Sequence, residues 1–209
     1  VDPAIQPEQH PGGHRRVGQQ LARAQDQIVE CGDVMFDAAL HFVEKAAASR
    51  AGAARLGLDP GGYVLATIHR QENTDITARL SSIINGLAKV AAKLPVVLPL
   101  HPRTRARIDA AGLGDNLKAL RVIDPVGYLD MVGLEKDAAV IATDSGGVQK
   151  EAFFHGVPCV TLRDETEWVE LVEAGWNRLV PPGDAGDIAD AILKARETKG
   201  RAVMPYGEG

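Results

Sequence analysis

The sequence has few cysteines, few aromatic residues, no long apolar run and no excess of positive charge. Its two cysteines, Cys31 and Cys159, lack the spacing of a disulfide or zinc motif, so we expect inert thiols in a reducing compartment. No apolar run could span a bilayer and no signal-peptide pattern opens the chain, which predicts a cytoplasmic protein without a membrane partner. The net charge of −5 argues against a nucleic-acid-binding protein.

What is present fits an ordinary globular protein. The chain has 209 residues, of which 45% are hydrophobic and 24% charged. Residues 1–27 are rich in Pro, Gly and Gln and poor in apolar anchors, so we expect an irregular N-terminal arm. Residues 28–200 form the predicted folded domain, and residues 201–209 form a predicted C-terminal tail.

Within residues 28–200, short apolar runs alternate with amphipathic segments. Strands are expected at Ile28–Cys31, Tyr63–Thr67, Val96–Leu100, Leu120–Ile123, Ala139–Ala142, Cys159–Leu162 and Arg178–Val180. Helices are expected at Val34–Ala48, Ile76–Lys93, Arg103–Ala111, Gly127–Glu135, Val148–Phe154, Glu167–Ala174 and Ala185–Glu197. This alternation predicts an α/β fold, a Rossmann-like doubly wound parallel sheet covered by helices on both faces.

Polar residues follow several of these strands at their carboxyl ends, where such sheets bind ligands. After Ala139–Ala142 comes Thr-Asp-Ser145-Gly146-Gly147 and then a helix. A helix start offers unpaired amides to an anion, Ser145 can cap it, and glycines let a phosphate approach the backbone. The alternative is a tight turn with an N-cap.

Two histidines and an arginine end neighbouring strands. His69 and Arg70 follow Tyr63–Thr67, where the histidine can exchange a proton near neutral pH and the arginine can bind an oxyanion. His101 follows Val96–Leu100. The alternatives are a solvated loop with a helix cap at Asn73 or Thr74, and a structural histidine at position 101.

Glu151 and Trp168 complete the candidate site. Glu151 lies one turn into the helix after Gly147, where a carboxylate could bind a ribose diol or simply be solvated. Trp168 could form a ligand wall or belong to the core. Together the strand ends predict a phosphorylated, ribose-bearing ligand. The sequence lacks the G-x-G-x-x-G fingerprint, a Walker lysine loop and metal-ligand spacings, so we expect no nicotinamide cofactor and no metal.

The segments "ATIHRQEN", "PLHPR", "ATDSGGVQKEAFFHGVPCVTLRDETEW" and "AGWNRLV" resemble the non-hydrolysing UDP-N-acetylglucosamine 2-epimerases. The resemblance covers about Val29 to Pro182. It implies a GT-B architecture of two Rossmann-like domains, with this chain as the C-terminal half, and catalytic carboxylates supplied by the N-terminal domain. It therefore also implies that this chain is truncated or a fragment, with residues 1–27 as a remnant of the N-terminal domain.

The resemblance implies a role for each matching residue. His69 is the implied catalytic histidine. Ser145, Gly146 and Gly147 are implied to bind the diphosphate, and Glu151 the ribose. His101 is implied to bind sugar nucleotide, and Met131, in "IDPVGYLDM", to lie at the uracil. Trp168 stands where many family members have a phosphate-side arginine. The segment "TEWVELVEAGWNRL" resembles the branch of the family that acts on modified sugars.

The implied reaction is C2 inversion of a UDP-sugar, of the UDP-GlcNAc to UDP-ManNAc type, by elimination and re-addition of UDP without a cofactor. We expect a homo-oligomer, a dimer, and a role in cell-wall polysaccharide biosynthesis. The alternatives are a non-catalytic UDP-sugar-binding fragment or pseudoenzyme, and a GT-B glycosyltransferase.

Overall fold

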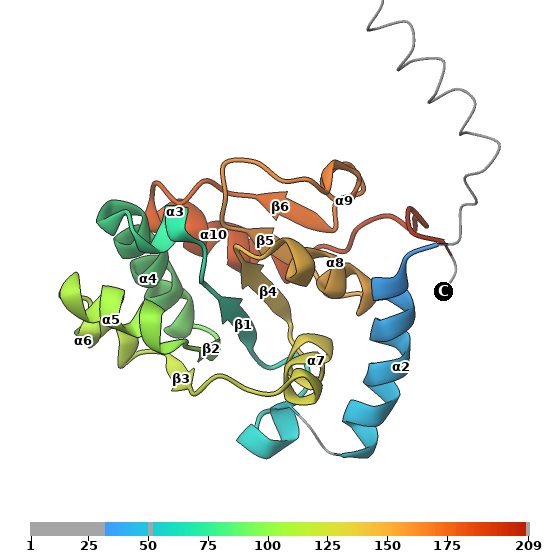
Figure 1. The fold of residues 1–209 in the computed structure, drawn as a ribbon. Helices are drawn as coiled ribbons and strands as arrows, with labels where there is room; N and C mark the ends of the chain where they lie inside the picture. Colours follow the sequence, from blue (N-terminus) through green and yellow to red (C-terminus); the bar gives the residue numbers. More distant parts are fainter. Residues whose placement is uncertain (1–31, 50–51, 208–209) are drawn as a thin grey trace, which may run out of the picture. The chain divides into compact units, whose positions relative to one another are not determined.

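The computed structural model describes residues 32–49 and 52–207, and their centre is a six-stranded parallel sheet (Figure 1). The strand order is β3-β2-β1-β4-β5-β6. The strands are β1 (Val64–Thr67), β2 (Val96–Pro99), β3 (Arg121–Ile123), β4 (Val140–Thr143), β5 (Cys159–Thr161) and β6 (Asn177–Leu179). This confirms the predicted Rossmann-like fold. The predicted arm at 1–27 and strand at Ile28–Cys31 lie outside the described residues.

All seven predicted helices are found, with ends that differ by at most a few residues. They are α2 (Val34–Ala48), α4 (Thr77–Ala91), α5 (Pro102–Ala110), α7 (Tyr128–Lys136), α8 (Gly146–Phe154), α9 (Val169–Glu173) and α10 (Ala185–Ala195). Three short helices were not predicted, namely the 3₁₀ helix η2 (Gly52–Leu56), α3 (Gln71–Thr74) and α6 (Gly114–Leu117). Four or five residues are too few to show a helical period. Among the described residues no helix could cross a membrane.

The side chains of β1, β2, β4 and β5 alternate between two apolar layers. Val64 and Ala66 of β1 pack with the layer that contains α4 and α10. Leu65, between them, packs on the other face with residues of α7 and α8. Every residue of β1 is buried, as expected for a strand covered on both sides.

The helices α4 and α10 pack closely because one position on α4 has no side chain. A Cβ built at Gly86 would lie 2.8 Å from Cγ2 of Ile188. A glycine is therefore required here by the helix contact and not by a turn. On the other face, α2 packs against α7 and α8, and Asp33 caps α2 by accepting from the amide of Met35 at 2.8 Å.

The C-terminal residues of the described part pack against α9. The amide of Arg201 donates to the carbonyl of Ala174, and the hydroxyl of Tyr206 donates to the carboxylate of Glu170. The boundary that we drew at residue 200 stays a prediction, since these contacts join both sides of it.

The strand order fixes where a ligand site can form. Strands β1 and β4 are neighbours, but the chain leaves β1 toward β2 and leaves β4 toward β5, in opposite directions along the sheet. A crevice opens at the carboxyl ends of two such strands. Residues after Thr67 and Thr143, which pair in register, therefore border this crevice.

Candidate functional site

The ends of β1 and β4 are joined by their threonines. The hydroxyls of Thr67 and Thr143 lie 2.6 Å apart and form a buried hydrogen bond. The same Oγ1 of Thr143 accepts from the amide of Ser145 at 2.9 Å. These bonds hold the turn into α8 against the end of β1.

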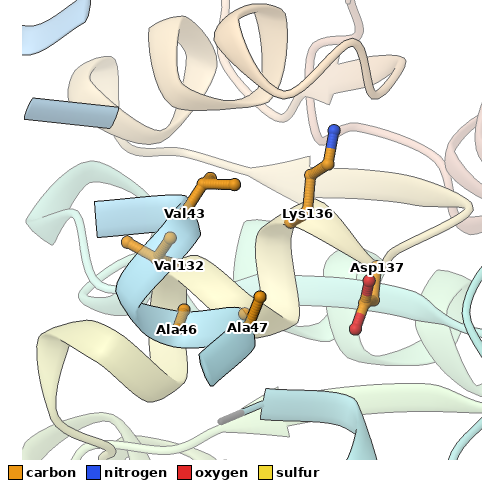
Figure 2. A pocket seen from close by; sticks show the side chains of 7 residues that line it. Val43, Ala46, Ala47, Val132, Lys136 and Asp137 are labelled. Carbon is orange, nitrogen blue, oxygen red and sulfur yellow. The ribbon is translucent and has the colours of Figure 1, made fainter. Parts of the chain in front are cut away.

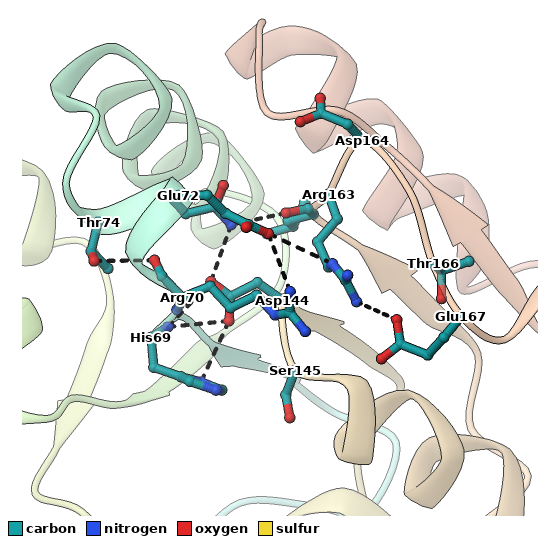
Figure 3. Close-up of polar contacts among 12 residues, drawn as sticks. His69, Arg70, Glu72, Thr74, Asp144, Ser145, Arg163, Asp164, Thr166 and Glu167 are labelled. Carbon is teal, nitrogen blue, oxygen red and sulfur yellow. Dashed lines mark hydrogen bonds and ion pairs between the residues drawn. The ribbon is translucent and has the colours of Figure 1, made fainter. Parts of the chain in front are cut away.

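Asp144 is the centre of the hydrogen bonds at this edge (Figure 3). Its side chain is fully buried, and it accepts from the amides of His69 and Arg70 and from Nδ2 of Asn73, each at 3.1 Å. Asn73 is also fully buried and donates to the carbonyl of Leu162, so the alternative of a solvated loop with a cap there is wrong. Our sequence analysis missed Asp144, although an acid directly after a buried strand was a usable signal.

His69 is oriented by the same carboxylate. Its Nδ1 lies 3.4 Å from Oδ1 of Asp144, while 56% of its side chain is exposed. A carboxylate beside Nδ1 favours a proton on that nitrogen and leaves Nε2 to exchange a proton with a ligand. Arg70, next to it, is half-buried and contacts Glu72 with Nη1 at 3.4 Å.

The start of α8 has the features expected of an anion site. The hydroxyl of Ser145 caps the helix by accepting from the amide of Val148 at 3.4 Å. Among the hydrogen bonds of the described residues, none involves the amides of Gly146 or Gly147. Helix-start amides without partners, at the positive end of the helix, favour an anion such as phosphate.

Gly147 has no structural requirement to be glycine within this chain. A Cβ there would have only ordinary contacts, 3.8 Å from Cε of Met35 and 3.9 Å from Oγ of Ser145. Its φ angle is not in the left-handed region. The absence of a side chain is thus better explained by the approach of a ligand than by packing.

Arg163 and Glu167, to which the sequence analysis assigned no binding role, lie beside the helix start (Figure 3). Arg163 is 6% exposed, and its Nη1 donates to Oε2 of Glu167 at 2.7 Å. Burial raises the pKa of Glu167, but hydrogen bonds from its own backbone and Arg163 lower the pKa more, so that the net shift is downward. The usable signal was an arginine directly after a buried strand.

Trp168 covers the first turn of α8. Its Nε1 donates to the carbonyl of Gly146 at 2.8 Å, and the Nζ of Lys150 lies 4.6 Å from its ring. Lys150 is only 4% exposed, forms an ion pair with Asp33 and also lies 4.4 Å from the ring of Tyr206. Trp168 is therefore a partly buried anchor for the helix start.

Glu151 is a half-buried carboxyl one turn into α8. Burial raises its pKa to about 7, and the Glu135 carboxyl adds to this rise, while His155 and the hydrogen bond from Tyr128 lower the pKa. Tyr128 itself is 47% exposed at the start of α7. The alternative of a fully solvated helix residue is wrong for Glu151.

Behind Glu151 lies a buried pair that our sequence analysis missed. Nε2 of His155 is 3.6 Å from Oε2 of Glu135, and these two side chains are 2% and 1% exposed. Burial raises the pKa of Glu135 to about 8 and lowers the pKa of His155 to about 4. Glu135 lies in α7 and His155 directly follows α8, and no pattern in the sequence indicated that the two would meet.

Two predicted binding residues lie at the edges of this arrangement. His101 is exposed at the carboxyl end of β2, and its Nδ1 caps α5 by accepting from the amide of Arg103 at 3.2 Å. Met131 is partly buried and packs against the core beneath α7. Their ligand contacts stay predictions, as do those of His69, Arg70, Ser145, Gly146, Gly147, Glu151 and Trp168.

A separate hollow of about 240 Å³ lies between α2 and α7 (Figure 2). Its lining includes Val43, Ala46 and Val132, with Lys136 and Asp137 at the end of α7. The end of α7 leads into the beginning of β4, so this hollow is at the amino ends of the strands. Its lining is mostly apolar and includes none of the residues predicted for the site.

The fold and the strand ends together define a class of protein. Three features border one switch point of a doubly wound sheet. They are the start of α8 with its free amides, His69 oriented by a carboxylate, and the buried Arg163. Proteins with this arrangement bind phosphorylated nucleotides at the carboxyl ends of their strands.

Comparison with known proteins identifies the family. The sequence profile described as UDP-N-acetylglucosamine 2-epimerase matches residues 14–209, and the chain belongs to this family. It is 48% identical over 184 residues to a UDP-2,3-diacetamido-2,3-dideoxy-D-glucuronate 2-epimerase of Pseudomonas aeruginosa, covering 87% of this chain and 48% of that protein. It is also 48% identical over 188 residues to a UDP-N-acetylglucosamine 2-epimerase homolog of Methanococcus maripaludis, covering 87% and 51%.

A solved structure agrees. The UDP-GlcNAc 2-epimerase of Methanocaldococcus jannaschii superposes with a TM-score of 0.79 at 34% identity, covering 92% of this chain and 56% of that one. A structure of the same enzyme in complex with UDP-GlcNAc and UDP gives a TM-score of 0.75. These neighbours have the GT-B architecture, and the chain matches their C-terminal part. It spans about half the length of the curated relatives it matches.

Proposed function

We propose that this chain is the UDP-binding part of a UDP-sugar 2-epimerase. In the proposed reaction a base removes the C2 proton of a 2-acetamido sugar while the bond from C1 to the UDP oxygen breaks, giving a 2-acetamidoglucal. UDP then adds back to C1, and C2 is protonated on its opposite face. This chemistry needs a stabilised diphosphate leaving group and acid and base groups, but no redox cofactor or metal.

The observation that carries the proposal is the free helix start of α8 beside His69 at the β1–β4 switch point. Ser145, Gly146 and Gly147 would bind the diphosphate. Glu151 would accept hydrogen bonds from the ribose hydroxyls. His69 would act as the catalytic histidine, through the Nε2 that Asp144 leaves available.

Four further residues would complete the site. Arg70 would contact a phosphate oxygen, and Met131 would lie near the uracil. His101 would bind sugar nucleotide at the neighbouring strand end, and Trp168 would close the diphosphate side. The substrate would be UDP-GlcNAc or a modified UDP-sugar with a 2-acetamido group, since the chain is 48% identical both to the Pseudomonas enzyme and to the Methanococcus homolog.

Calorimetric titration of this chain with UDP tests the proposal directly. We expect binding with one UDP per chain, and no binding at millimolar UDP would refute it. Turnover is then followed by proton NMR with UDP-GlcNAc and with UDP-2,3-diacetamido-2,3-dideoxy-D-glucuronate. A C2 epimer or free 2-acetamidoglucal supports an epimerase, and UDP binding without turnover supports the non-catalytic alternative. A new glycoside formed on an added acceptor would support a glycosyltransferase.

We also propose that the protein acts in the cytoplasm as a homo-oligomer, a dimer, in cell-wall polysaccharide biosynthesis. Large apolar side chains that are more than half exposed, such as Val34, Val169 and Met204, support an association surface. Analytical ultracentrifugation at micromolar concentration tests the dimer, and a purely monomeric sedimentation coefficient would contradict it.

A further inference from the structure

Arg163 is a buried cation at the edge of the sheet where the proposed ligand binds. It follows β5, the neighbour of β4, and its guanidinium contacts Glu167, whose carboxylate lies beside the first turn of α8 (Figure 3). Only 6% of the residue is exposed. Burying a charge is strongly unfavourable unless hydrogen-bond and ion-pair partners compensate for the lost hydration.

The partners of Arg163 within the described residues are incomplete. Nη1 donates to Glu167 at 2.7 Å, but the buried Nε has no hydrogen-bond partner and lies 3.8 Å from a carboxylate oxygen of Glu72. The side chains of Glu72 and Glu167 are 51% and 41% exposed, so both acids can turn to solvent at small cost. A buried, partly unsatisfied guanidinium faces two movable anions.

The carboxylate of Glu167 lies beside the first turn of α8, although it accepts no hydrogen bond from the amides of Gly146 and Gly147. A Cβ built at Gly146 would overlap Oε1 of Glu167, which shows how closely this oxygen lies over the first turn of α8. The positive end of a helix favours a negative charge in that position. A second anion cannot share it, because like charges at contact distance repel strongly.

We propose that Arg163 is a diphosphate-binding residue and that the carboxylate of Glu167 takes the position of the diphosphate, as an internal anion, until the ligand binds. When the ligand binds, the side chain of Glu167 rotates into solvent and the guanidinium of Arg163 donates to the phosphate oxygens instead. Arginine suits this exchange because its planar fork can bind a phosphate through two parallel hydrogen bonds. The inference rests on the proposed function and adds a residue and a competing group to it.

The test compares Glu167→Gln with Glu165→Gln, a change of an exposed acid in the same loop. Both variants and the unchanged chain are titrated with inorganic pyrophosphate and with UDP. We expect Glu167→Gln to bind pyrophosphate about fivefold more tightly, the fold-change that corresponds to one ion pair of this exposure. Glu165→Gln should match the unchanged chain.

A third variant, Arg163→Lys, keeps the charge and removes the planar fork. We expect it to weaken pyrophosphate binding about tenfold, the equivalent of about 1.4 kcal/mol. Equal or weaker binding by Glu167→Gln, or unchanged binding by Arg163→Lys, would overturn the inference.

A measurement without ligand separates this inference from the proposed function. In the free protein, Glu167→Gln should move the amide NMR signals of Gly146 and the Nε–H signal of Arg163, whereas Glu165→Gln should not. Signals that stay in place would overturn the inference even if UDP binds. Tight pyrophosphate binding by Glu167→Gln without any UDP binding would leave the inference standing and refute the nucleotide function.

Discussion

The buried carboxylate of Asp144 lies 3.4 Å from Nδ1 of His69 and accepts the backbone amide of the same residue. One side chain at the end of β4 thus sets both the backbone and the ring of the residue that follows β1. The histidine is thereby placed by a neighbour 75 residues away in the chain. This explains why an exposed side chain can hold a defined orientation.

Asp144→Asn should destabilise the fold. The carboxylate accepts from three donors, the amides of His69 and Arg70 and the Nδ2 of Asn73. An asparagine would replace one acceptor with an NH₂ group that faces these donors. We expect the free energy of unfolding in urea to fall by about 2–4 kcal/mol. Asp124→Asn, which changes an exposed acid at the same edge of the sheet, is the control, and an equal effect of both changes would contradict the prediction.

Gly147→Ala should separate ligand binding from folding. A Cβ at this position finds room in the protein, so the midpoint of thermal unfolding should stay the same or rise. The same methyl group would meet a phosphate at the helix start, and we expect UDP affinity to fall at least about tenfold. His69→Ala should retain UDP affinity, because His69 acts on the sugar in our proposal. Comparable losses of affinity in both variants would show that these roles are not divided.

Glu151→Gln should affect UDP affinity in a pH-dependent way. Burial raises the pKa of Glu151 to about 7, so its carboxyl is mostly protonated at pH 6 and mostly ionised at pH 8. Only the ionised form accepts hydrogen bonds from both ribose hydroxyls. The ratio of the affinities of the unchanged chain and the variant should therefore rise with pH, with a midpoint near pH 7.

Calorimetry between pH 6 and pH 8.5 measures the affinity ratio for Glu151→Gln. Ionisation of the UDP phosphates affects the affinities of both proteins equally and therefore cancels in the affinity ratio. The ratio would stay constant if Glu151 did not touch the ribose.

The sheet and most helices could be predicted because each is a local pattern of apolar residues. The run that forms β1 and the face of α4 that carries Leu80, Ile83 and Leu87 are two examples. The sequence predicted a parallel sheet without a strand order, and the neighbours of each strand came from the structure. The short helix α3 escaped prediction because its position depends on Asn73 binding Asp144, a tertiary contact.

The site could be predicted to the level of strand ends and no further. Ser145, Gly146 and His69 stand directly after strands, and the edge of a parallel sheet brings such residues together. The pairing of Arg163 with Glu167 depends on the path of the loop after β5, and the pairing of Glu135 with His155 depends on how the end of α8 packs against α7. No residue spacing in the sequence indicates these tertiary contacts.

The buried Glu135 and His155 pair should make stability depend on pH. Burial raises the pKa of Glu135 from 4.5 to about 8, so between these values the folded state binds more protons than the unfolded state. The free energy of unfolding must then fall as pH rises through that window. His155, whose pKa burial lowers from 6.5 to about 4, acts in the opposite direction, but only below pH 6.5.

Above pH 6.5 the decline is therefore due to the acids alone, Glu151 up to about pH 7 and Glu135 up to about pH 8. Each proton contributes a slope of at most about 1.4 kcal/mol per pH unit. Glu135→Gln removes the contribution of the Glu135 proton. Urea unfolding at half-unit steps from pH 6.5 to pH 8 should therefore show a flatter decline of the free energy of unfolding. Glu44→Gln, an exposed change on α2, should keep the original slope. A slope unchanged by Glu135→Gln would mean that this carboxyl is already ionised in the folded protein.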